Sequence, residues 1–198
     1  MSSKFRLLTT LVLFGGIVVA PYSSAATPRS AAMLANTCAG CHGTDGYSAG
    51  GHMPSLAGLN SRYLYQAMVN YQNDVRPSTI MGRIARGYSD NELKAMAAYF
   101  AAKPWQQAAQ IEEGSLSETG SELHQQLCAS CHQDEGRSQQ RDTPRLAGQW
   151  HDYLFDQLTD MQQGGGYHGS HPAKMLQRVE QLSSDQLRAI SHFYASQK

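Results

Sequence analysis

The chain has 198 residues, of which 41% are hydrophobic and 16% are charged, a length that suits one ordinary domain or two very small ones. This composition excludes a disordered chain and one that spans a membrane throughout. Sixteen basic residues balance sixteen acidic residues, so the basic excess that general DNA or RNA binding requires is absent, and we expect no nucleic-acid partner.

The first 26 residues have the pattern of a secretory signal peptide. Lys4 and Arg6 precede a mostly apolar run at 7–20, and small residues fill 23–26. The run is too short to span a bilayer comfortably, and its glycines and the proline after it weaken the alternative of an uncleaved membrane anchor. We therefore expect cleavage after residue 25 or 26, export to the periplasm and no stable membrane span.

Several helices have recognisable start signals or periodicity. We expect one helix to run into the first cysteine motif, and a capping box at Thr119–Glu122 to open its counterpart in the second half. Apolar residues at helical spacing predict helices over 63–71 and 153–161. Capping boxes at Ser89–Glu92 and Ser183–Gln186 predict where the closing helix of each half begins. No segment has the pattern of a strand.

All four cysteines fall in two copies of one pattern, Cys-Ala-Gly-Cys-His at 38–42 and Cys-Ala-Ser-Cys-His at 128–132. This pattern is the attachment signature of haem c. The thiols of each motif add to the two vinyl groups of one haem, and the following histidine becomes the proximal ligand of its iron. The predicted attachment residues are Cys38, Cys41, Cys128 and Cys131, and the predicted proximal ligands are His42 and His132. The sequence therefore predicts two haem c groups.

Three other uses of paired cysteines explain this pattern less well. A structural zinc site would need four ligands to converge, and a thioredoxin-like pair would need a βαβ context and a single motif. A disulfide framework gives no reason for a histidine after the second cysteine in both copies.

The chain repeats itself with an offset of 90 residues. Placing Cys38 on Cys128 superposes Pro-Ser-Leu-Ala-Gly at 54–58 on Pro-Arg-Leu-Ala-Gly at 144–148. A four-residue insertion in the glycine-rich stretch 164–170 then changes the offset to 94. Two homologous units of about 80 residues follow from this register.

The repeat predicts the domain organisation of the chain. We expect an all-α fold with two tandem domains, at 27–104 and 117–198, each wrapped around one haem. The segment 105–116 is largely polar and has no counterpart elsewhere in the repeat, so we interpret it as a linker.

An axial ligand that both units need should recur in both, and one methionine pair does. Met81 falls opposite Met175, and the two residues lie 39 and 43 positions after their proximal histidines, far enough for the chain to cross the haem. We therefore predict Met81 and Met175 as the distal iron ligands. Five other methionines lack a methionine counterpart and are interpreted as packing or loop residues, namely Met33, Met53, Met68, Met96 and Met161.

Histidine is the rival distal ligand. Four histidines outside the motifs fall opposite other residue types, namely His52, His124, His151 and His192. His168 and His171 lie in or beside the insertion, so His171 stays open as a competitor of Met175, although a loop histidine in solvent is the favoured interpretation.

These features together resemble the dihaem cytochrome c4 family, in which two class I cytochrome c units each carry a cysteine motif, a Pro-x-Leu-Ala-Gly segment and a ligand methionine. The resemblance covers nearly the whole chain after the signal peptide. A closer likeness is to the dihaem subunit of flavocytochrome c sulfide dehydrogenase. It rests on Ser-Thr-Ile-Met-Gly-Arg-Ile-Ala-Arg-Gly-Tyr-Ser at 78–89, Leu-Ala-Gly-Gln-Trp at 146–150 and Phe-Tyr-Ala-Ser-Gln at 193–197.

The resemblance implies a flavoprotein partner that oxidises sulfide at a flavin and passes electrons singly to the two haems. A downstream soluble cytochrome or an oxidase would then accept them. Pro54 and Pro144 are similar to the prolines whose carbonyls orient the proximal imidazole in this family. Around 164–166 the sequence departs from the family, which affects the geometry ahead of Met175.

An iron with both axial positions filled has none open for substrate, so we expect electron transfer without catalysis by this chain alone. Two alternatives stay open: a free shuttle similar to cytochrome c4, between a quinol-oxidising complex and a terminal oxidase, and a dihaem peroxidase with one open iron. Arg76, Arg83 and Arg86 flank Met81, where they would help to dock a partner or serve only as solvated charges.

Overall fold

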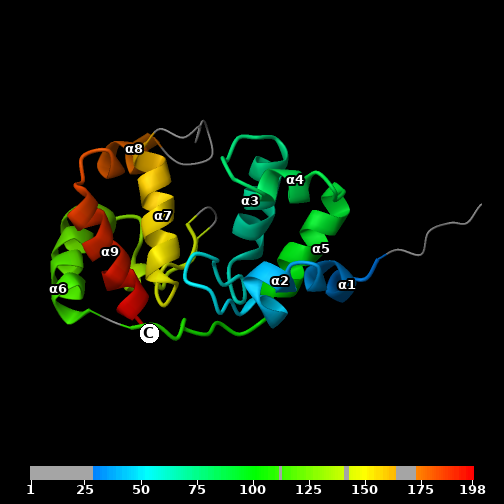
Figure 1. The fold of residues 1–198 in the computed structure, drawn as a ribbon, viewed down its shortest axis with the longest axis horizontal. Helices are drawn as coiled ribbons and strands as arrows, with labels where there is room; N and C mark the ends of the chain where they lie inside the picture. The colour runs from blue at the N-terminus through cyan, green and yellow to red at the C-terminus, as the bar shows by residue number, and fades with distance from the viewer. Residues whose placement is uncertain (1–28, 112, 141–142, 164–172) are drawn as a thin grey trace, which may run out of the picture.

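The computed structural model describes residues 29–111, 113–140, 143–163 and 173–198 (Figure 1). The predicted signal peptide, the glycine-rich insertion, His168 and His171 lie outside these ranges. Across the described part of the chain, no helix has the length and apolar character needed to cross a membrane.

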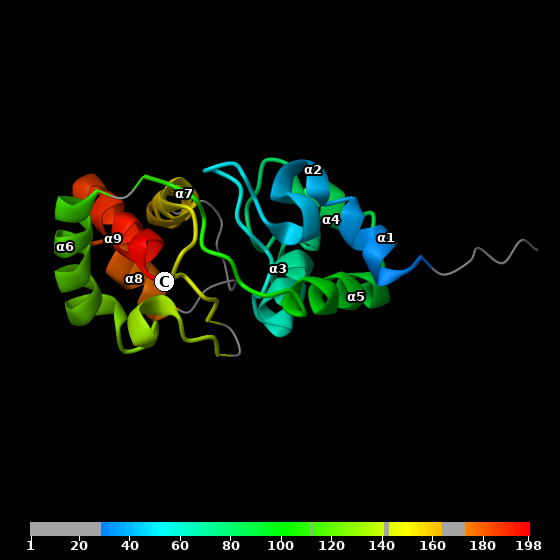
Figure 2. The same cartoon turned by 90° about the horizontal axis from the view of Figure 1, so that it is seen from below.

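The described helices form two lobes that lie side by side, and an extended segment connects the lobes along one edge of the molecule (Figures 1 and 2). The first lobe contains α1 (Ala31–Asn36), α2 (Ala39–His42), α3 (Ser61–Gln72), α4 (Met81–Ala85) and α5 (Asp90–Ala101). The second contains α6 (Gly114–Leu123), α7 (His151–Gln162), α8 (Ala173–Val179) and α9 (Ser184–Ser196). None of the described segments is a strand, so the predicted all-α class is confirmed.

The strongest local signals in the sequence give the predicted helices. Ser89 and Glu92 form the capping box of α5, and Ser183 and Gln186 form that of α9. In each box the serine side chain accepts the backbone N–H of the third helical residue, and the side chain of that residue accepts the backbone N–H of the serine. Both N–H groups would otherwise have no partner inside the helix. The helices predicted from apolar spacing are α3 and α7.

The capping box predicted at Thr119–Glu122 is wrong. The helix α6 begins at Gly114, and Thr119 lies inside it with its hydroxyl donating to the Ser115 carbonyl at 3.3 Å. A hydroxyl inside a helix can bond the carbonyl one turn before it, so a capping signal does not always mark a helix start. The last residues of the segment 105–116, expected to be a linker, are therefore helical.

The two lobes share a hydrogen-bonded loop after the cysteine motif, which we call the proximal loop (46–58 and 136–148). The Gly46 carbonyl accepts the N–H groups of Leu56 and Ala57 at 2.8 and 3.2 Å, and the Gly58 N–H donates to the Phe100 carbonyl at 2.9 Å. The second lobe repeats these bonds at 2.8, 3.1 and 2.8 Å, in the pairs Leu146–Gly136, Ala147–Gly136 and Gly148–Tyr194. The offsets are those of the sequence repeat, so its register is confirmed in three dimensions.

Each lobe has its own hydrophobic core. In the first lobe α1 and α3 pack on α5, and in the second α6 and α7 pack on α9. The buried residues of the larger clusters are Ala35, Leu59, Leu64, Ala97 and Phe100 in the first lobe, and Leu123, Leu154, Leu187, Ile190, Phe193 and Tyr194 among others in the second. Met96 and Met161 are also buried, which confirms their interpretation as packing residues.

Two glutamine side chains of the second lobe form hydrogen bonds with the backbone of the first lobe. The Gln149 side chain accepts the Ser55 N–H and donates to the Ser55 carbonyl, both at 3.0 Å. The Gln139 side chain accepts the Asn60 N–H at 2.7 Å and donates to the Gly58 carbonyl at 3.0 Å. Each amide therefore satisfies one donor and one acceptor of the first lobe's backbone.

The contact between α6 and α9 gives a prediction about stability. A Cβ at Gly120 would lie 2.2 Å from the Ala189 carbonyl oxygen and 2.6 Å from Phe193 Cβ. We predict that Gly120→Ala lowers the free energy of unfolding by about 1–3 kcal/mol through overpacking, even though alanine favours helices. Denaturant unfolding followed by circular dichroism measures this loss. Gly114→Ala is the control, because its Cβ would have no neighbour within 4 Å, and an equal loss there would contradict the explanation.

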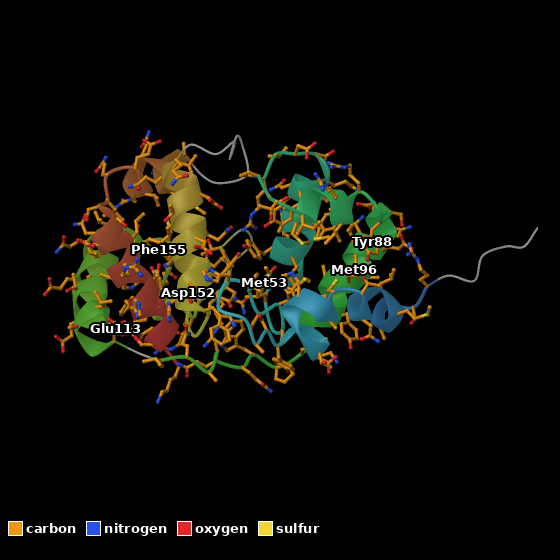
Figure 3. The ribbon with its side chains drawn as sticks, viewed as in Figure 1. Met53, Tyr88, Met96, Glu113, Asp152 and Phe155 are labelled. Atoms are coloured by element: carbon orange, nitrogen blue, oxygen red, sulfur yellow. The ribbon has the colours of Figure 1, made fainter. Side chains whose placement is uncertain are left out.

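An ion pair between the lobes gives a prediction about pH. His52 Nδ1 lies 2.7 Å from an Asp156 carboxylate oxygen. Asp152 adds a second negative charge. It lies on the side of the second lobe that faces Met53 (Figure 3). The hydrogen bond to Asp156 raises the pKa of His52 above 6.5. The pair therefore stabilises lobe contact fully below about pH 6.5, and its contribution is lost as pH rises through the His52 pKa. We predict that Asp156→Asn lowers the pKa of His52 and that Asp152→Asn lowers it less. An NMR titration of the His52 ring measures both changes. An unchanged pKa in Asp156→Asn would contradict the contact between His52 and Asp156.

Candidate haem sites

The first cysteine motif folds as one helical turn. Cys38 caps α2, and Cys41 and His42 lie inside it, so two thiols and an imidazole project from a single turn. Both cysteines are free, with Cys41 exposed and Cys38 half-buried. Burial raises the pKa of the Cys38 thiol. The turn thus presents two unpaired thiols beside one imidazole.

The orientation of the His42 ring is fixed by the proximal loop. His42 is 8% exposed, and its Nδ1 lies 2.9 Å from the Pro54 carbonyl oxygen, as predicted for that proline. Because a carbonyl only accepts, Nδ1 carries the proton and Nε2 keeps its lone pair. Burial lowers the pKa of His42, although the bond to Pro54 opposes that effect. The ring is therefore neutral near pH 7, with Nε2 able to bind a metal.

The second motif has a similar but not identical arrangement. Cys128 ends a turn of π-helix at His124–Cys128, and its thiol and that of Cys131 are free. His132 is 9% exposed, and burial, with a smaller effect from His124, lowers its pKa to about 4. This imidazole is therefore also neutral near pH 7.

The predicted bond between His132 and the Pro144 carbonyl is absent. His132 Nδ1 is buried, and within the described structure it has no hydrogen-bond partner. The two proximal loops also differ in what the other lobe offers them. Gln149 of the second lobe binds the peptide after Pro54 in the first lobe. The equivalent residue of the first lobe is Leu59, whose side chain has no polar group to bind the peptide after Pro144.

The two predicted distal methionines occupy matching places in the lobes. Met81 is the first residue of α4, and Met175 lies in the first turn of α8. Each of these short helices packs against the long helix before it, α3 or α7. Both methionines are half-buried, and Met175 contacts the core of the second lobe. Their assignment as iron ligands stays a prediction.

The other described histidines have partners of their own. His124 is 1% exposed, and its Nδ1 bonds the Tyr194 hydroxyl at 2.9 Å. His151 and His192 stack with their ring centroids 4.3 Å apart, and His52 pairs with Asp156. No sequence signal predicted the buried pair of His124 and Tyr194, because Leu34 and Phe100 take these places in the first unit.

The side chains present fit covalently attached haem. Each lobe offers two free thiols on one turn and a buried neutral imidazole, and a short helix of the same lobe carries a thioether. In the part of the chain that the structure describes, no three or more His, Cys, Asp or Glu side chains are grouped to hold a metal ion. The zinc alternative therefore has no support there.

Comparison with known proteins identifies the family. Residues 29–102 and 117–198 match the cytochrome c family. The cytochrome c4 of Azotobacter vinelandii is 31% identical to this chain in an alignment 205 positions long, gaps included, that spans 94% of this chain and 96% of that protein. The chain belongs to the cytochrome c family. It is a cytochrome c4-like electron carrier with two covalently bound haem c groups.

Two other relatives are a subunit and an electron acceptor of dehydrogenases. The cytochrome subunit of sulfide dehydrogenase from Chlorobaculum tepidum is 39% identical over 85 residues, which cover 43% of this chain and 76% of that protein. The thiosulfate dehydrogenase electron acceptor of Stutzerimonas stutzeri is 30% identical over 182 residues, 86% of this chain and 83% of that protein. The resemblance to the sulfide dehydrogenase subunit is therefore partial, and the likeness to cytochrome c4 extends further along the chain.

A solved structure has the same fold. The reduced recombinant cytochrome c4 from Pseudomonas stutzeri superposes with a TM-score of 0.76 at 24% identity, over 85% of this chain and 97% of that one. The predicted fold of two class I cytochrome c domains in tandem is confirmed.

Arg76 does not belong to the predicted docking group. It is 5% exposed, its guanidinium lies over the Tyr71 ring at 4.9 Å, and it donates to the Tyr153 hydroxyl at 3.3 Å and to the Gln157 side chain. Arg76 therefore connects α3 and α7, and an external partner cannot reach it. No feature of the sequence indicated this burial, because a basic residue near a ligand is more often exposed.

The methionine assignment is tested by removing each thioether. We predict that Met81→Ala and Met175→Ala each open one iron, so that each variant binds carbon monoxide at one haem and lowers that haem's reduction potential. Absorption spectra with and without carbon monoxide, and a redox titration, measure these changes. Met33→Ala is the control, since Met33 is 61% exposed. An unchanged spectrum in either ligand variant would show that another residue binds that iron; at the second haem, the competitor of Met175 is His171.

Proposed function

We propose that the chain is the electron-accepting subunit of a periplasmic dehydrogenase that oxidises reduced sulfur, with a flavoprotein sulfide dehydrogenase as its partner. The observation that carries the proposal is the 39% identity to a sulfide dehydrogenase cytochrome subunit over 85 residues. The relative that accepts electrons from thiosulfate dehydrogenase supports the same class of donor.

In this proposal the chain supplies eight residues to the two haems. They are Cys38, Cys41, His42 and Met81 in the first lobe, and Cys128, Cys131, His132 and Met175 in the second. When bound, each haem iron takes up and releases one electron. The cysteines would hold each group covalently, the imidazole and the thioether would bind its iron, and methionine ligation would favour a positive potential. The chain therefore conducts electrons, and its partner carries out the oxidation.

The surface around Met81 suits the docking of that partner. Ile80 and Ile84 are exposed, at 46% and 38%, although they are large and apolar. Arg83 and Arg86 are exposed beside them. An apolar patch with a basic rim fits a partner surface with an acidic rim, which speeds encounter without requiring a permanent complex.

A free shuttle is the second candidate. The likeness to cytochrome c4 covers 94% of the chain, more than the likeness to the sulfide dehydrogenase subunit does. A shuttle would carry electrons from a quinol-oxidising complex to a terminal oxidase, with no stable flavoprotein partner.

The two candidates are separated by a pull-down. We predict that the tagged mature protein, taken from its native periplasm, brings with it a flavin-containing protein and that sulfide then reduces both haems. Flavin fluorescence and haem absorption are the measurements. Arg83→Glu should reduce the recovery at low salt, and Arg188→Glu, the same charge change on α9, should not. A flavin-free dihaem protein that sulfide does not reduce would support the free shuttle instead.

A further inference from the structure

One peptide group of the first lobe connects the second lobe to His42, the proximal histidine of the first lobe. The Pro54 carbonyl and the Ser55 N–H belong to the same planar amide. The carbonyl accepts from His42 Nδ1 at 2.9 Å, and the N–H donates to Gln149 Oε1 at 3.0 Å. A chain of hydrogen bonds therefore runs from a side chain of the second lobe to the imidazole of the first.

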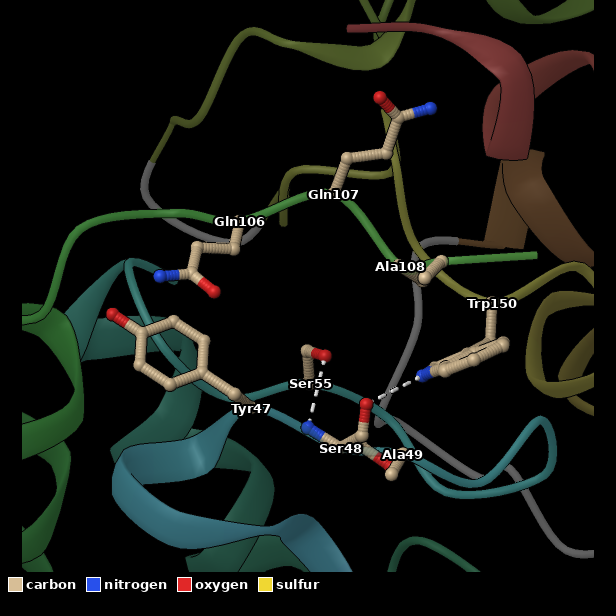
Figure 4. Close-up of a pocket in the computed structure, with 9 residues that line it drawn as sticks. Tyr47, Ser48, Ala49, Ser55, Gln106, Gln107, Ala108 and Trp150 are labelled. Atoms are coloured by element: carbon tan, nitrogen blue, oxygen red, sulfur yellow. Dashed lines mark hydrogen bonds between the residues drawn. The ribbon is translucent and has the colours of Figure 1, made fainter.

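The two residues that join the lobes in this chain of hydrogen bonds are buried. Gln149 is 2% exposed and Ser55 is 3% exposed. The two bonds to Ser55 determine which end of the Gln149 amide faces which atom, because the N–H needs an acceptor and the carbonyl needs a donor. Next to Gln149, the Trp150 indole donates to the Ser48 carbonyl at 3.2 Å, and the Ser48 N–H donates to the Ser55 hydroxyl at 3.3 Å (Figure 4).

Hydrogen bonds in series strengthen one another. An amide whose N–H is hydrogen-bonded carries more negative charge on its carbonyl oxygen, since the two ends share one delocalised system. The burial of Gln149 and Ser55 increases the effect, because a hydrogen bond is stronger in surroundings of low dielectric constant. The Pro54 carbonyl is therefore a better acceptor for the His42 N–H than an amide with a free N–H would be.

We propose that Gln149 is a positioning residue of the second lobe that lowers the reduction potential of the haem in the first lobe. It acts through the Pro54–Ser55 peptide: a stronger acceptor at Nδ1 makes His42 a more basic ligand, and a more basic ligand stabilises ferric iron over ferrous iron. The inference rests on His42 as the iron ligand, which is part of the proposed function.

In the described structure, the second lobe contacts the peptide at His42 of the first lobe, and the first lobe makes no equivalent contact at His132. Leu59 occupies the place of Gln149 in the first unit, and His132 Nδ1 has no hydrogen-bond partner in the described structure. The haem of the second lobe therefore lacks this control. A movement that separates the lobes would raise the potential of the first haem and leave the second unchanged.

The interface provides a matched control. Gln139 makes the same kind of two-bond contact from the second lobe to the backbone of the first, at Asn60 and Gly58. Neither of these groups belongs to the peptide that contacts His42. Gln139→Met and Gln149→Met therefore remove equal numbers of bonds between the lobes, and only Gln149→Met removes one from the Pro54–Ser55 peptide.

The experiment compares holoproteins with Gln149→Met, Gln139→Met and Gln149→Glu. NMR of the ferrous state follows the Nδ1 protons of His42 and His132, and a redox titration gives the potential of each haem. We expect Gln149→Met to shift the His42 proton upfield and to raise the first haem's potential, with His132 and the second haem unchanged. Gln139→Met should change neither. Gln149→Glu at mildly acidic pH should restore the His42 signal, because a buried protonated carboxyl makes the same two bonds as the amide.

Equal effects of the two methionine variants would overturn the proposal, since they would show a general effect of loosening the lobes. No change at His42 in Gln149→Met would also overturn it. A failure of the underlying ligand assignment looks different, because the unmodified protein would then lack a haem-shifted His42 ring signal.

Discussion

The hydrogen bonds of the proximal loop are the constraint on which the first haem site and the contact between the lobes depend. In each lobe one glycine carbonyl accepts two N–H groups from ten and eleven residues further on, and a second glycine N–H is tied to the closing helix, so the loop is held between the cysteine turn and the core. Gly46 and Gly136 have φ values of 84° and 83°, a conformation that favours glycine. Without these bonds Pro54 would not lie at hydrogen-bond distance from the His42 ring, and the first lobe would offer Gln149 no ordered backbone to bind.

The two lobes use this shared loop differently, and the difference gives the molecule a direction. In the first lobe the loop also forms the surface on which the second lobe sits, so its proximal histidine is coupled to contact between the lobes. In the second lobe the space around His132 is shaped instead by the buried pair of His124 and Tyr194. Two homologous units thereby provide two different environments, which an electron carrier with two haems needs if its sites are to differ in potential.

The sequence predicted the parts of the structure that depend on local chemistry or on repetition. The cysteine motifs, the repeat register, the closing helices and the all-α class follow from spacing and composition. The structure also added what spacing cannot show. Thr119 had the spacing of a helix cap, because its bond to the Ser115 carbonyl exists only once the helix has formed. Arg76 was expected to be exposed, because its partners Tyr153 and Gln157 are about 80 residues away in the chain. Gln149 was part of a family likeness, but its contact with Ser55 depends on how the lobes meet.

The most direct test of the account is an NMR spectrum of the unmodified ferrous holoprotein, recorded with and without carbon monoxide. The central claim is that both irons are closed by a histidine and a methionine, so the chain conducts electrons without binding substrate. The account predicts two methionine side chains, Met81 and Met175, shifted far upfield by the haem ring currents, and no change when carbon monoxide is added. A single shifted methionine, or a haem that binds carbon monoxide, would contradict the claim and favour a dihaem enzyme with one open iron.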